Sequence, residues 1–138
     1  MQPNQPRHWN NWIAGIGIVK VAFAVPHFVD DFLYGIPEEF GLTNPQAQVL
    51  GGLYFAAYML AVVMAGRGIR ASYYATCAFG LFLTAALILR HMEGILAAEP
   101  YWGGLVSEGS IIGLLVSSIA LAAVSLAALR SSSGDENP

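Results

Sequence analysis

The side chains most able to do chemistry in this sequence are two histidines and several acids near the ends of long apolar segments. His27 is followed by Asp30 and Asp31, His91 closes a later apolar segment, and Glu108 opens the last one. Two imidazoles with carboxylates form a ligand set suited to zinc, iron, copper or manganese. If these side chains meet, the sequence predicts a transition-metal site made by His27, Asp31, His91 and Glu108, or a haem held by the two histidines.

A seven-residue spacing places further polar side chains on the same helical face as His27. Lys20, His27 and Tyr34 nearly superpose at about 100° per residue, and Asp30 and Asp31 lie one turn beyond His27. Ionisable groups inside a membrane span are costly, so this stripe is expected to face protein or water. Histidine as a residue type titrates near neutral pH, so the stripe also suits proton or ion handling, with Asp31 or Lys20 as the relay.

A second polar stripe is expected on the third apolar segment. Cys77, Thr84 and His91 repeat at intervals of seven residues, so Thr84 joins the candidate ligand-handling residues. If His27 and His91 converge from diagonal helices, the pocket between them should fit an organic ligand better than a single ion.

Structural roles for the same residues stay open. The stem of Lys20 is long enough to reach the inner headgroups, which would turn its amine away from the bundle. Arg90 could neutralise Asp30 or Asp31 at the membrane interface. Glu108 at a helix N-terminus is favoured by the helix dipole without any further role.

Composition indicates a membrane protein. Of 138 residues, 56% are hydrophobic and 11% are charged, and the mean hydropathy is +0.56. The single cysteine, Cys77, excludes an intramolecular disulfide and a CxxC redox pair. The chain has no basic block that could track a phosphate backbone, so nucleic acid is not an expected partner.

Four apolar segments must position the candidate residues, and each is long enough to cross a bilayer. We predict an all-α integral membrane protein, an antiparallel four-helix bundle that runs up-down-up-down in the plasma membrane. The expected parts are a polar cytoplasmic N-terminus (1–11), helices at about 12–34, 45–66, 70–92 and 107–130, and a disordered cytoplasmic tail (131–138). Asn44 is expected to cap the second helix ahead of Pro45.

Basic residues in the short connections predict the orientation. Arg7, Arg67, Arg70 and Arg130 should share one side, which the positive-inside rule makes the cytoplasm, so both termini are expected inside. Small residues are expected at the helix contacts. The predicted contact stripes are Ser110, Gly113, Ser117 and Ala120 on the last helix, and Gly52 and Ala56 on the second.

Three function classes fit this pattern. The preferred one is a non-enzymatic subunit, assembly factor or small-ligand binder with a polar pocket at the extracytoplasmic side. The second is a metal- or haem-dependent membrane enzyme or redox protein that uses His27 and His91. The third is a proton- or ion-coupled transporter, which would need a homo-oligomer because four helices enclose little space. The expected partners are the lipid bilayer and either further copies of the chain or the other subunits of a membrane complex.

Overall fold

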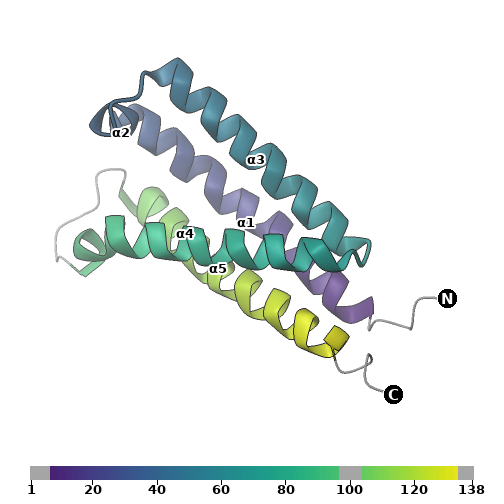
Figure 1. Ribbon diagram of the computed structural model, residues 1–138. Coiled ribbons are helices and arrows are strands. Elements are labelled where there is room, and N and C mark those ends of the chain that lie inside the picture. The colour runs from purple at the N-terminus through teal and green to yellow at the C-terminus, as the bar shows by residue number, and fades with distance from the viewer. Residues whose placement is uncertain (1–6, 97–103, 134–138) are drawn as a thin grey trace.

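The computed structural model describes residues 7–96 and 104–133, and within them it contains helices and turns but no strand. The helices in chain order are α1 (Arg7–Leu33), α2 (Ile36–Glu39), α3 (Asn44–Gly66), α4 (Arg70–Leu96) and α5 (Gly104–Ser133) (Figure 1). All but α2 are long and apolar enough to cross a membrane. The prediction of an all-helical chain with four long apolar helices is therefore confirmed.

The helices differ from the predicted ranges mainly at their ends. α1 begins at Arg7, before the predicted Trp12, and α5 continues to Ser133, into the segment predicted as a tail. The connection after α1 contains the short helix α2, which follows Gly35 in the left-handed conformation (φ 71°). Glycine adopts this conformation without strain, so the chain can turn sharply at that point. The rest of the predicted tail, from residue 134 onward, lies outside the described residues.

Thr43, and not the predicted Asn44, caps the N-terminus of α3. The Thr43 backbone N–H donates a hydrogen bond to Oε1 of Gln46 at 2.9 Å, as in a capping box. Asn44 is already the first residue of the helix, so it lies one position too late to act as the cap. Pro45 lies in the first turn as expected. The N–H groups of the first turn have no intrahelical acceptor, so the missing N–H of proline costs no hydrogen bond there.

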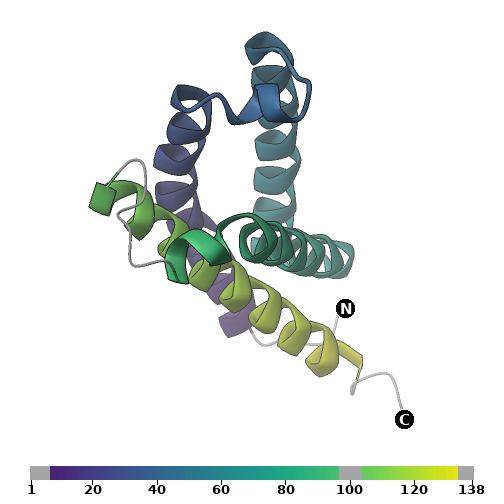
Figure 2. The same cartoon turned by 90° about the vertical axis from the view of Figure 1, so that its left-hand side faces the viewer.

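α5 is the helix against which the bundle is built. Both α4 and α1 pack extensively on α5, whereas α3 makes smaller contacts with α4 and α1. The order around the bundle is therefore α1, α5, α4, α3, and α1 faces α4 across the diagonal (Figure 2). α3 and α4 meet at the turn that joins them and diverge toward the end that carries α2 (Figure 1).

The contact between α4 and α5 is close because it is built on small residues. A Cβ placed on Gly80 would lie 2.7 Å from the carbonyl oxygen of Ser118 and 2.9 Å from the backbone nitrogen of Ala122. One turn before Gly80, the hydroxyls of Thr76 and Ser125 share a hydrogen bond of 2.8 Å between the two helices. Close backbone approach and buried hydroxyl pairs are the usual means of joining helices where lipid removes the hydrophobic drive.

The small-residue stripe predicted on the last helix lies at a helix contact. Ser117 is buried, and Gly113 leaves room for the ring of Phe23 on α1, whose nearest atom would lie 2.3 Å from an added Cβ. On α3 the prediction is wrong, because Gly52 and Ala56 are both exposed.

A neighbouring face of α3 makes the contact with α1. Gly51 is buried, and a Cβ there would lie 2.6 Å from the ring of Phe28. The aromatic side chain of Tyr58 is also buried on this inward side. The inward face of α3 therefore combines one glycine with large aromatic side chains and does not follow the small-residue pattern.

Replacing Gly80 with valine should destabilise the protein by about 1–3 kcal/mol, because the added side chain meets the α5 backbone and forces the two helices apart. The measurement is the free energy of unfolding in mild detergent. The control is Gly52→Ala, which places a methyl group where nothing lies within 4 Å and should leave stability unchanged or slightly raised. Equal stability of Gly80→Val and the parent would contradict the close α4–α5 contact.

Candidate functional site

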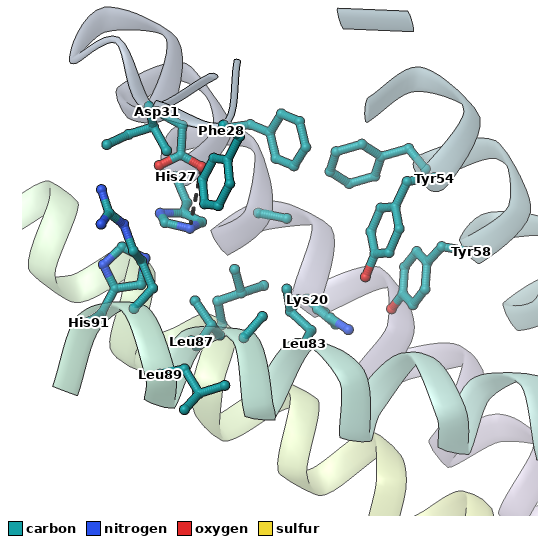
Figure 3. A pocket seen from close by; sticks show the side chains of 17 residues that line it. Lys20, His27, Phe28, Asp31, Tyr54, Tyr58, Leu83, Leu87, Leu89 and His91 are labelled. Carbon is teal, nitrogen blue, oxygen red and sulfur yellow. Dashed lines mark ion pairs between the residues drawn. The ribbon is translucent and has the colours of Figure 1, made fainter. Parts of the chain in front are cut away.

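A cavity of about 550 Å³ lies among α1, α3 and α4, with residues of α2 beside it (Figure 3). This volume is in the range of pockets that hold small organic ligands. Most of its wall is apolar or aromatic, including Phe28, Phe55, Leu83 and Leu87. The polar side chains that line it are Lys20, His27, Asp31, Tyr54, Tyr58, Arg90 and His91.

Lys20 marks one end of the cavity. The residue is only 2% exposed, and Nζ lies 4.8 Å from the ring centroid of Tyr58. Within residues 7–96 and 104–133, Nζ has no hydrogen-bond partner. A cation over an aromatic face gains some stabilisation, but much less than a buried ammonium loses by leaving water. Burial of Lys20 favours the inward orientation over the alternative in which its amine reaches the headgroups.

Two tyrosines of α3 stand beside Lys20. The rings of Tyr54 and Tyr58 are nearly parallel, with centroids 6.5 Å apart, and their hydroxyls point toward the same end of the cavity (Figure 3). Tyr58 donates its hydroxyl proton to the carbonyl oxygen of Gly17 on α1 at 2.9 Å. The hydroxyl of Tyr54 is buried and has no partner among the described residues. Two donors without an acceptor, Lys20 and Tyr54, therefore lie on the same cavity.

The other end of the cavity carries the two histidines. The ring centroids of His27 and His91 lie 5.1 Å apart with the rings 75° from parallel, and each residue is 7% exposed. Nε2 of His27 lies 3.7 Å from Oδ2 of Asp31, one turn later on α1. This distance is too long for a direct hydrogen bond but permits an ion pair when the histidine is protonated. Convergence of His27 and His91 from the diagonal helices α1 and α4 encloses an organic-sized pocket.

Arg90 has one acidic neighbour that was not expected. Its guanidinium donates to Oε2 of Glu39 on α2 at 2.5 Å, and it also interacts electrostatically with the expected Asp31. Both side chains of this pair are exposed, so the pair adds little stability. It does connect α2 to the end of α4, next to the cavity.

The structure brings together four of the predicted site residues and leaves four apart. Lys20, His27, Asp31 and His91 line the cavity. The predicted residues that do not line it are Asp30, Tyr34, Thr84 and Glu108.

Local geometry explains three of these absences. Thr84 donates its hydroxyl to the carbonyl oxygen of Gly80 in its own helix at 2.8 Å, which is a common use of threonine in apolar helices. Tyr34 lies beyond the last residue of α1 and is 45% exposed. Glu108 is on α5, which lies diagonally opposite α3. The cavity wall includes Leu114 of α5 but not Glu108.

The aromatic wall from α3 was not foreseen. Tyr54 and Tyr58 are four residues apart and so share a helical face, which is a signal the sequence does contain. Because α3 contains no charged residue, the sequence does not show whether this face packs against another helix or faces lipid.

Among the residues that the structure describes, no three His, Cys, Asp or Glu side chains are grouped so as to hold one metal ion. The metal or haem site at His27, Asp31, His91 and Glu108 stays a prediction.

Comparison of this chain with protein-family models, curated proteins and solved structures gives no match.

The Lys20→Met variant should be more stable than the parent protein by about 1–3 kcal/mol in lipid-free detergent. Methionine keeps an unbranched side chain but removes a buried amine that has no acceptor among the described residues. The free energy of unfolding in detergent measures this. Lys20→Ala is the matched control and should lose stability, because it also removes the apolar stem. A loss of stability in Lys20→Met would show that the amine has an acceptor within the protein.

Proposed function

We propose that this chain is a small integral membrane protein that binds an amphipathic organic molecule in the cavity between α1, α3 and α4. It acts as a binding protein, subunit or assembly factor and not as an enzyme. The observation that carries this proposal is the cavity of about 550 Å³, which has apolar walls and polar side chains at both ends. A molecule with an apolar body and a polar head satisfies such a lining.

Insertion into lipid is supported by the outer faces of the helices. Large apolar side chains stand exposed on all four long helices, among them Ile18 (62%), Leu53 (63%), Phe82 (65%) and Val116 (61%). A water-soluble bundle would bury such side chains or replace them with polar ones. Contact with lipid tails accounts for both their type and their exposure.

In the proposed orientation the chain crosses the plasma membrane in up-down-up-down order with both termini in the cytoplasm. Arg67 and Arg70 flank the turn between α3 and α4, and Arg130 lies in the last turn of α5. The positive-inside rule puts this end in the cytoplasm. The end of the cavity with His27 and His91, near α2, then lies toward the extracytoplasmic side.

Filling the cavity should abolish ligand access. In liposomes, a long-chain alcohol carrying a diazirine group should label peptides of α1 and α4 that line the cavity, as mapped by mass spectrometry. Ala86 lines the cavity, so Ala86→Phe should reduce this labelling at least five-fold. Ala85, one residue earlier, is exposed, so Ala85→Phe should leave it unchanged. Labelling confined to outward-facing residues, or equal in both variants, would contradict the proposal.

The orientation can be tested by cysteine labelling in intact cells, in a Cys77→Ser background. Glu38 on α2 and Ser131 near the end of α5 are both exposed. Glu38→Cys should react with a membrane-impermeant maleimide added outside the cells, and Ser131→Cys should react only after permeabilisation. The reverse pattern would invert the proposed topology.

A further inference from the structure

Two hydrogen-bond donors that have no acceptor among the described residues lie on the same cavity, and they indicate the head group of the ligand. The amine of Lys20 and the hydroxyl of Tyr54 come from different helices, α1 and α3, and both are buried (Figure 3). Buried polar groups are nearly always satisfied in folded proteins, and an orphan donor calls for an explanation. An acceptor on a bound molecule would supply one.

The charge balance around Lys20 is the stronger constraint. The nearest acid on its own polar stripe that lines the cavity is Asp31, eleven residues away, or about 16 Å along the helix axis. Asp31 lies beside His27, and Arg90 beside Glu39, at the other end of the cavity. A buried ammonium remote from any carboxylate is strongly unfavourable, whereas one that is paired and hydrogen-bonded is not.

We propose that Lys20 and Tyr54 bind the carboxylate of a long-chain fatty acid, whose hydrocarbon chain lies against the aromatic wall of the cavity. This inference rests on the proposed function and names the ligand class. One carboxylate oxygen accepts a charge-assisted hydrogen bond from Nζ of Lys20, and the other accepts the hydroxyl proton of Tyr54. A single negative charge balances the single positive charge at this end of the cavity.

Other head groups fit this end less well. An alcohol would leave the ammonium without a counter-charge, and a dianionic phosphate monoester would bring an excess negative charge into a low-dielectric site. The histidine end is a poorer place for an anion because the carboxyl group of Asp31 already lies beside His27 there and Arg90 is paired with Glu39. The carboxylate therefore belongs at Lys20.

The hydrocarbon chain has a path away from Lys20. A second cavity of about 310 Å³ shares Phe28, Asp31, Ile36, Phe40 and Tyr54 with the first and continues between α1 and α3 to Leu50. Leu50 on α3 lines this second cavity and is 53% exposed, so the path opens at the outer surface of the bundle. Its lining is nearly all apolar, as an acyl chain requires.

The test uses the full chain after extraction of bound lipid, in mild detergent. Oleate, oleyl alcohol and oleyl phosphate compete separately with the diazirine alcohol probe, and the concentration that halves cavity labelling is measured for each. In the parent protein, oleate should compete at least ten-fold better than oleyl alcohol and also better than oleyl phosphate.

The variants assign this preference to the two donors. In the Lys20→Met variant, oleate and oleyl alcohol should compete equally well with the probe, because methionine keeps the apolar stem and removes the charge. In the Tyr54→Phe variant, the concentration of oleate that halves labelling should rise three- to ten-fold, and that of oleyl alcohol should change little. The control is Ser118→Ala. It removes a buried hydroxyl that lies outside the cavity and also has no partner among the described residues, so the competition by oleate and by oleyl alcohol should stay unchanged. Continued alcohol binding by each variant shows that its cavity is intact.

The contradicting results separate this inference from the proposed function. Equal competition by oleate and oleyl alcohol in the parent, or a preference for oleate that survives in Lys20→Met, would overturn the carboxylate site while the binding cavity stands. Tighter competition by oleyl phosphate would replace the carboxylate with a phosphate head group. Failure of all three compounds, with no specific labelling of the cavity, would overturn the proposed function itself.

Discussion

The burial of a lysine amine in an apolar bundle is the constraint on which the rest of this structure depends. The hydrocarbon core of a bilayer supplies no water, so every polar group in a span must find its partner inside the protein or on a bound molecule. Lys20 turns inward, and only 2% of the residue stays exposed. The polar face of α1 must therefore point into the bundle, and the cavity forms where that face meets α3 and α4.

The helix contacts explain why there is room for a cavity. α5 binds α4 through the glycine at position 80 and binds α1 through the glycine at position 113, so these three helices lie close together. On its inward face α3 carries Tyr54, Phe55 and Tyr58, which hold it farther from its neighbours than small residues would. A close three-helix contact and one helix held apart by aromatic rings leave a wedge, and α2 lies beside its wider end (Figure 1).

The sequence alone predicted the number of long helices, because each apolar segment is long enough to cross a bilayer. It also predicted the polar face of α1, because Lys20 and His27 are seven residues apart and so lie on one side of a helix. It also put His91 at the same end of the bundle as His27, but it left open whether the two side chains meet. It could not supply the order of the helices around the bundle, which depends on close contacts such as that of Gly80 with Ser118. It also missed Tyr54 and Tyr58, since an uncharged apolar span has no residue that must face inward and therefore no marker of its inner face.

The most direct test of this account is the distance between the amine nitrogen of Lys20 and the carboxyl carbon of a bound fatty acid. Solid-state NMR on protein with ¹⁵N-labelled lysine, loaded in liposomes with ¹³C-carboxyl oleate, measures it through dipolar dephasing. Lys20 is the only lysine in the chain, so the signal is unambiguous. The account predicts a separation of about 3–4 Å, as in a charge-assisted hydrogen bond. Bound oleate with no dephasing of its carboxyl carbon by the Lys20 nitrogen would contradict it.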